Sequence, residues 1–229
     1  MKDRLIVALD VDTFGKAKKI VNMLKKNVNI YKIGSILFTR EGPAIVKYIK
    51  KLNKKVFLDL KYHDIPNTVG MAVKQASELG ADILTIHTSG GLGMMKEAVK
   101  NKGRTLVFGV TVLTSTNNEI LKKEMGVEKD VKKQVIHLAK FAKKAGLDGV
   151  VASGEETQLI RKACGSNFLI ITPGVRPAGG QKGDQKRVVT PAIAIKKGAN
   201  FIVVGRPIIQ SDDPAGAAKA ILNEISGIK

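Results

Sequence analysis

Residues 56–87 read VFLDLKYHDIPNTVGMAVKQASELGADILTIH. The apolar run at the start predicts a strand at Val56–Lys61, and the following pattern predicts a helix over Thr68–Leu79. Gly80 is a typical helix stop, and the β-rich run Ile83–His87 predicts a second strand. This segment is therefore expected to form one strand, helix and parallel strand.

The same alternation of short β-rich runs and longer helical patterns continues along the chain. The predicted strands are Leu5–Asp10, Ile30–Gly34, Val56–Lys61, Ile83–His87, Leu106–Val112, Gly149–Ser153, Phe168–Thr172 and Phe201–Gly205. The predicted helices are Gly15–Lys26, Pro43–Leu52, Thr68–Leu79, Leu92–Lys100, Val131–Ala145, Glu155–Ala163, Pro191–Lys197 and Asp213–Ile225. Eight such units in 229 residues predict a single domain, residues 1–229, folded as a closed (β/α)8 TIM barrel. A doubly wound open sheet is the alternative.

Three of the turns that lead from a helix into a strand have similar sequences. They are Gly80-Ala81-Asp82, Gly146-Leu147-Asp148 and Gly198-Ala199-Asn200. The glycine is typical of a helix C-terminus, so these turns indicate a recurring structural unit.

The chain is strongly basic, with 39 basic and 20 acidic residues and a formal net charge of +19. Lysine doublets such as Lys18-Lys19 and Lys143-Lys144 recur along the predicted helices and do not form one stripe. Aromatic residues are few and are not interleaved with the basic ones. This pattern favours solvated, lysine-rich helix faces over a nucleic-acid partner.

Targeting and metal-binding patterns are also missing from the sequence. No apolar run reaches the about 18 residues of a membrane span, and the first residues lack the apolar region of a signal peptide. We therefore expect a cytoplasmic protein without a membrane partner. Cys164 is the single cysteine, and His63, His87 and His137 have no zinc-binding spacing, so we expect no metal.

A cluster of charges marks the end of the strand Val56–Lys61. Side chains alternate along a strand, so Asp59 and Lys61 point to the same face, and Asp64 follows closely. A structural ion pair is the simpler interpretation. However, half-buried charges are costly unless they are partnered, so a cluster beside an apolar run indicates a functional site.

Other polar residues fall at the same ends of the predicted strands, where barrel active sites form. They are Asp10, Lys32, His87, Thr111, Thr114, Ser153, Pro173-Gly174 and Gly205-Arg206. Lys32 lies within a strand and needs a carboxylate, for which Asp59 on the next strand is suited. We therefore predict an alternating array of Lys32, Asp59, Lys61 and Asp64, which could hold a proton donor where negative charge develops.

A phosphate site is predicted after the last two strands. Loops at this place in barrels often bind phosphate, and Arg176 and Arg206 can supply charge-assisted hydrogen bonds. The alternative is that both arginines are solvated. The long irregular stretch Gly174–Arg187 is typical of a functional lid.

Several motifs together carry a resemblance to a known family. The most specific is Asp59-x-Lys61-x-x-Asp64-Ile65-Pro66-Asn67-Thr68-Val69. It is supported by Leu5–Asp10, Leu113-Thr114-Ser115, Thr172-Pro173-Gly174-Val175-Arg176-Pro177, Gly183-Asp184-Gln185 and Val203-Val204-Gly205-Arg206. On these residues the chain resembles the orotidine 5′-phosphate decarboxylases over essentially its full length. The resemblance implies conversion of orotidine 5′-monophosphate to uridine 5′-monophosphate in pyrimidine synthesis, without a cofactor.

The resemblance also implies roles for individual residues. Lys61 would protonate C6 of the pyrimidine after carbon dioxide leaves. Asp59 would lie against the departing carboxylate, and Lys32 would hold that carboxylate and contact the ribose. The other implied substrate-binding residues are Asp10 for the ribose hydroxyls, Thr114 for the pyrimidine edge, Arg176, Gln185, Gly205 and Arg206 for the phosphate and its closing loop, and Ile65 and Pro173 within the matching motifs. Val175 stands where an isoleucine is common, which is a mild departure.

The resemblance further implies a homodimer, in which Asp64 and Thr68 reach into the partner's active site. Two other interpretations stay open. The first is a magnesium-dependent sugar-phosphate decarboxylase or formaldehyde-lyase, which shares the Asp-x-Lys-x-x-Asp pattern but not the following Ile65-Pro66-Asn67-Thr68. The second is a basic RNA-binding barrel without catalysis.

Overall fold

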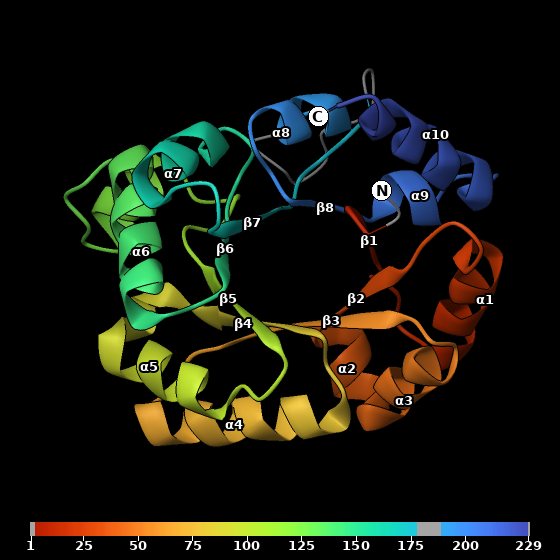
Figure 1. Ribbon diagram of the computed structural model, residues 1–229, viewed down its shortest axis with the longest axis horizontal. Coiled ribbons are helices and arrows are strands. Elements are labelled where there is room, and N and C mark those ends of the chain that lie inside the picture. The colour runs from red at the N-terminus through yellow and green to blue at the C-terminus, as the bar shows by residue number, and fades with distance from the viewer. Residues whose placement is uncertain (1–2, 178–188, 229) are drawn as a thin grey trace.

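The computed structural model describes residues 3–177 and 189–228. Eight parallel strands pair in chain order, and β1 pairs with β8 to close the barrel. The strands are β1 (Leu5–Ala8), β2 (Ile30–Gly34), β3 (Lys55–Tyr62), β4 (Ile83–His87), β5 (Leu106–Val110), β6 (Gly149–Val151), β7 (Leu169–Thr172) and β8 (Phe201–Val204). Figure 1 shows the strands as an inner ring surrounded by helices, with the two ends of the chain close together. The closed barrel is confirmed, and the open sheet is wrong.

The outer ring contains the predicted helices and several short elements that we did not predict. The predicted ones are α1 (Phe14–Leu24), α3 (Pro43–Lys51), α4 (Pro66–Leu79), α5 (Gly91–Asn101), α6 (Val131–Ala145), α7 (Thr157–Cys164), α8 (Pro191–Lys196) and α10 (Pro214–Ser226). The additional ones are α2 (Ser35–Glu41), α9 (Arg206–Ile209), the 3-10 turn η1 (Thr88–Gly90) and the π-helical turn η2 (Ile120–Glu124). Both α2 and α9 are short and begin within two residues of the end of a strand, so the sequence pattern does not distinguish them as separate helices.

Strand alternation divides the apolar residues into two cores. Inside the barrel, the packed side chains are Ile6, Ala8, Ile30, Phe57, Ile83, Phe108, Ile171 and Val203. The residues between them along the strands, such as Leu58 and Leu84, pack outward against the helices. Phe57 therefore marks the inner face of β3 and Leu58 the outer face.

Several strands are shorter at their carboxyl ends than predicted. β1 ends at Ala8, so Asp10 lies beyond the strand, and β6 ends at Val151, before Ser153. Ser153 is buried, and its Oγ accepts the N–H of Glu155 within a turn. Asp10 and Ser153 therefore belong to the loops that follow β1 and β6.

The recurring turns form clamps at the amino-terminal ends of β4, β6 and β8. In each clamp, one side-chain oxygen before the strand accepts a backbone N–H from the preceding strand and a hydrogen bond from a cationic side chain. The three sets are Asp82 with Val56 and Lys50, Asp148 with Val107 and Lys102, and Asn200 with Ile170 and Arg161. The similar sequences therefore reflect one stabilising arrangement on the barrel face opposite the predicted site.

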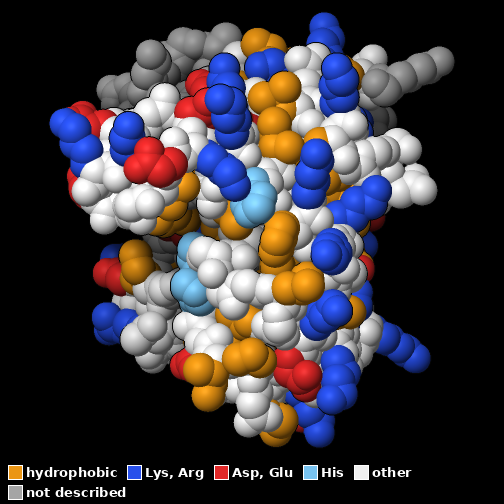
Figure 2. Space-filling view, turned by 90° about the vertical axis from the view of Figure 1, so that its left-hand side faces the viewer, with side chains coloured by type: hydrophobic (Ala, Val, Ile, Leu, Met, Phe, Trp, Pro, Cys, Tyr) orange, Lys and Arg blue, Asp and Glu red, His pale blue; other side chains and the backbone are white. Residues whose placement is uncertain are grey.

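Figure 2 shows the side of the barrel that carries α5, α6 and α7 in Figure 1. Lysine and arginine side chains are spread from the top to the bottom of this face, with apolar and other side chains between them. In the described residues, no helix is both long and apolar enough to cross a membrane.

Candidate active site

A chain of charged side chains occupies the carboxyl-terminal end of β1, β2 and β3. Lys32 Nζ lies 2.9 Å from Asp10 Oδ1 and 3.6 Å from Asp59 Oδ2, and Lys61 Nζ lies 3.0 Å from the same Asp59 oxygen. The predicted pairing of Asp59 with both lysines is therefore present. Asp10 gives Lys32 its shorter contact, which the sequence did not predict.

Burial of this array increases inward. The side chains of Lys32 and Asp59 are 12% and 13% exposed, whereas those of Lys61 and Asp10 are 35% and 50% exposed. Burial by itself raises the pKa of Asp59, but attraction to Lys32 and Lys61 and hydrogen bonds from Lys61 and Thr85 outweigh it and lower the pKa. Asp59 is therefore ionised at neutral pH.

The array lines a cavity of about 220 Å³. Its wall consists of Leu9, Asp10, Lys32, Gly34, Ser35, Ile36, Leu37, Asp59 and Lys61. Ser35, Ile36 and Leu37 belong to α2, so the helix missed in the sequence supplies part of this wall. A β-carbon on Gly34 would lie 3.0 Å from Lys32 Nζ, and the absence of a side chain there leaves room for the lysine.

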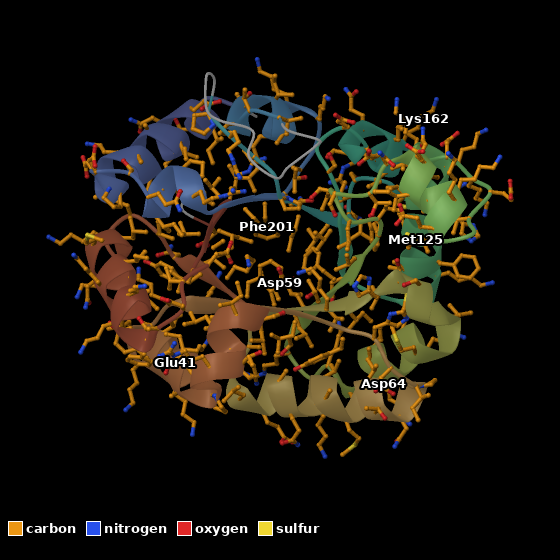
Figure 3. The ribbon with its side chains drawn as sticks, turned by 180° about the vertical axis from the view of Figure 1, so that it is seen from behind. Glu41, Asp59, Asp64, Met125, Lys162 and Phe201 are labelled. Carbon is orange, nitrogen blue, oxygen red and sulfur yellow. The ribbon has the colours of Figure 1, made fainter. Side chains whose placement is uncertain are left out.

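Asp64 lies outside the array of its own chain, so the predicted four-residue array is wrong within one chain. Figure 3 shows Asp59 facing the middle of the barrel, whereas Asp64 lies at the periphery beside α4. Asp64 Oδ1 accepts the N–H of Ile65 at 2.6 Å, and among the described residues no cation lies within ion-pair distance of it. The strand ends before Asp64, and the chain turns outward there.

The segment from His63 to Thr68 is exposed throughout. Ile65 is 66% exposed, and Thr68 lies in the first turn of α4, which begins at Pro66 and not at Thr68. Asp64, Ile65 and Thr68 do not belong to the wall of the cavity described above.

The other predicted residues lie at the same end of the barrel. A β-carbon on Gly205 would lie 3.4 Å from Asp10 Oδ2, so the end of β8 borders the array, and Arg206 begins α9. Arg176 is 8% exposed, and its backbone N–H donates to the Val189 carbonyl. Val189 also forms an isolated parallel β-bridge with Val175.

Thr114 is half-buried in the loop after β5, and Pro173 is half-buried just after β7. Gln185 and most of the predicted lid Gly174–Arg187 lie outside the described residues.

Thr85 is a neighbour of the array that the sequence analysis missed. It is fully buried on β4, its Oγ1 donates to Asp59 Oδ1 at 2.9 Å, and the same oxygen accepts the backbone N–H of Lys61 at 3.0 Å. A polar residue within the apolar run Ile83–His87 was the available signal. It shares a face with His87, which points inward from the same strand.

Comparisons with known proteins show the family of this chain. A family model described as "Orotidine 5'-phosphate decarboxylase / HUMPS family" matches residues 3–221. The chain belongs to this family. Among the relatives of this decarboxylase family, the orotidine 5′-phosphate decarboxylase of Moorella thermoacetica is 46% identical, covering 100% of this chain and 94% of the relative. The enzyme of the same name from Geotalea daltonii is 48% identical, covering 97% of this chain and 95% of the relative.

A solved structure supports the membership of the decarboxylase family at the level of the fold. The crystal structure of orotidine 5′-phosphate decarboxylase from Lactobacillus acidophilus matches with a TM-score of 0.87 and 37% identity, covering 96% of this chain and 98% of that one. Nearly the whole barrel is therefore shared with a family member, including the strands that carry the charged array.

Proposed function

We propose that this chain is a carboxy-lyase that converts orotidine 5′-monophosphate to uridine 5′-monophosphate and carbon dioxide. The Lys32, Asp59 and Lys61 array carries the proposal, because it supplies two cations and one anion around a cavity at the active end of a family barrel. The family description also covers a HUMPS branch, but both relatives described above are named orotidine 5′-phosphate decarboxylase.

The proposed chemistry breaks the bond between C6 and the substrate carboxylate. The electron pair stays on C6, where no carbonyl can delocalise it, so the protein has to stabilise the charge. The Lys61 ammonium is suited to this because it is held beside the cavity by Asp59 at 3.0 Å. Lys61 then gives a proton to C6, which forms the new C6–H bond, and takes up a proton from solvent.

Asp59 and Lys32 would act on the substrate carboxylate. Asp59 is 13% exposed and anionic, so a second carboxylate beside it is repelled until carbon dioxide leaves. Lys32, which contacts both Asp59 and Asp10, would hold that carboxylate and the ribose. Asp10, the more exposed end of the array, would bind the ribose hydroxyls.

The remaining contacts would come from the segments that follow β5, β7 and β8. Thr114 and Pro173 would contact the pyrimidine, while Arg176, Gln185, Gly205 and Arg206 would bind the phosphate. Remote phosphate contacts can supply binding energy for closing the segment Gly174–Arg187 over the site and excluding water. The pairing of Val175 with Val189 gives this segment a fixed base.

The active unit would be a homodimer. The exposed run from His63 to Thr68 would place Asp64 and Thr68 at the partner's cavity, completing the array there with a second carboxylate. We place this enzyme in the cytoplasm, and we propose no metal, no membrane partner and no nucleic-acid partner for it.

The test is to follow the ultraviolet absorbance of orotidine 5′-monophosphate with purified protein in EDTA. Conversion to uridine 5′-monophosphate by the native protein is expected. If conversion is absent with EDTA and with added magnesium, the proposal is wrong. Turnover of a sugar phosphate that requires magnesium would instead favour the other branch of the family.

A further inference from the structure

We infer that Thr85 is a positioning residue for the proposed decarboxylation: its single hydroxyl fixes Lys61 and Asp59 relative to each other. The kinetic consequences of this role rest on the proposed function.

The register between β3 and β4 shifts at the array. Leu58 pairs with Leu84 and Tyr62 pairs with Ile86, so β3 advances four residues while β4 advances two. Thr85 is therefore the β4 residue opposite the irregular stretch that contains Asp59 and Lys61. Bulges of this kind redirect side chains and are common beside active sites.

The backbone of Lys61 is strained within this bulge. Its φ is 52°, and in the described residues the other non-glycine residue with positive φ is Asn53. A left-handed conformation is unfavourable for a non-glycine residue, so neighbouring contacts have to hold it. In this conformation Lys61 Nζ lies 3.0 Å from Asp59 Oδ2, two positions earlier on the same strand.

The Thr85 hydroxyl supplies such a contact. The Lys61 N–H donates to Thr85 Oγ1 at 3.0 Å, so a side-chain hydroxyl accepts this backbone N–H. Because this N–H can only donate, the hydroxyl proton is available for another acceptor. Asp59 Oδ1, 2.9 Å away, accepts it, and an ionised carboxylate accepts only. The direction of both hydrogen bonds is therefore determined.

These bonds close a ring around the reacting groups. Thr85 holds Asp59 Oδ1 and the backbone of Lys61, while Asp59 Oδ2 holds Lys61 Nζ at 3.0 Å. Thr85 is fully buried, so water cannot replace its hydroxyl readily. Loss of the hydroxyl frees both the carboxylate and the strained backbone, and the Lys61 ammonium loses its fixed position.

The test compares Thr85→Val, which has nearly the same shape without the hydroxyl, with Thr85→Ser, which retains it. Thr105→Val is the matched control, because Thr105 is also buried and its Oγ1 bonds to the Ala81 carbonyl, in the barrel wall away from the array. We expect Thr85→Val to lower kcat by about 10- to 100-fold with KM within about threefold of the native value. Thr85→Ser and Thr105→Val should stay within about threefold in both constants.

Two results would overturn the inference. The first is a kcat of Thr85→Val within about threefold of native. The second is an equal loss in Thr85→Ser, which would assign the effect to packing of the methyl group. If Thr85→Val does not fold, Thr85→Ala replaces it in the same comparison.

Hydrogen exchange separates this inference from the proposed function. The Lys61 amide should be protected in the native protein and in Thr85→Ser, and should exchange faster when the hydroxyl is removed. An unchanged exchange rate would refute the positioning role even if the native protein is active. If the native protein does not decarboxylate orotidine 5′-monophosphate, the proposed function fails, and the exchange experiment still decides the role of Thr85.

Discussion

The Lys61 ammonium lies 3.0 Å from the Asp59 carboxylate, two positions earlier on the same strand. The two residues stand on one face of β3, where Lys61 has a positive φ and the pairing with β4 shifts in register. This contact orients a cation toward the cavity while the other Asp59 oxygen is held by Thr85.

Replacement of Lys61 should abolish turnover and preserve binding. We expect Lys61→Ala to lower kcat by at least about 1,000-fold, because it removes both the proton donor and the cation opposite the developing charge. Binding of uridine 5′-monophosphate, measured by calorimetry, should change far less. Lys55→Ala is the control, since Lys55 lies on the same strand and contacts only Asp3 at 3.6 Å among the ion pairs of the described residues. Substantial residual turnover in Lys61→Ala would remove Lys61 from the role of acid.

The two subunits should share their active sites. Asp59→Ala and Asp64→Ala proteins should each be inactive, and their mixture should regain about one quarter of the native sites after random reassociation, because each heterodimer has one intact site. Activity is measured after the mixed proteins are dissociated and reassociated. Mixing two samples of the same variant is the control. A mixture that stays inactive although heterodimers form would contradict the shared site.

Arg206 should act on the phosphate of the substrate. It begins α9 at the end of β8, next to Gly205, which borders Asp10. We expect Arg206→Ala to weaken binding of uridine 5′-monophosphate by about 10- to 100-fold, as expected for loss of a charge-assisted bond, with a much smaller effect on uridine. Equal losses for the nucleotide and the nucleoside would contradict the phosphate assignment.

The clamp at Asp148 should stabilise the barrel without affecting catalysis. Its carboxylate accepts from Lys102 at 2.5 and 2.6 Å and from the Val107 N–H at 2.8 Å. Asp148→Ala should lower the free energy of unfolding by about 3 kcal/mol, since it leaves the Lys102 charge unpaired in a half-buried place. Asp148→Asn should cost less, because Asn200 performs the same bonding with Arg161 in the clamp before β8. Urea unfolding at one protein concentration measures both, and kcat should stay near native.

The stability supplied by Asp59 should depend on pH in a defined direction. Its folded-state pKa is lower than the ordinary value of 3.8, so the unfolded chain takes up this proton at a higher pH than the folded protein. The stabilisation is therefore complete above the ordinary pKa and is lost as the pH falls through the folded value. The difference in unfolding free energy between native protein and Asp59→Asn should be constant from pH 6 to 7 and shrink below about pH 4. A difference that grows toward acid pH would contradict this assignment.

Local patterns predicted much of the architecture. Alternation of β-rich and helical runs is enough to count the barrel units, because each strand and helix has to bury one face or stripe of its own residues. The pairing of Asp59 with Lys61 was also predictable, since the two residues are neighbours on one face of one strand. Short elements such as α2 were not, because seven residues directly after a strand carry too little periodicity.

The sequence by itself determined that this protein is a basic (β/α)8 barrel with charged residues at the carboxyl ends of its strands, and its motifs indicated the decarboxylase family. Only the tertiary structure decided that Asp10 takes the shorter contact with Lys32, that Asp64 turns away from its own array, and that Thr85 completes it. These relations join residues on different strands or on either side of a bulge. They depend on strand register, on barrel closure and on a single positive φ, and no local pattern of residues encodes any of these three.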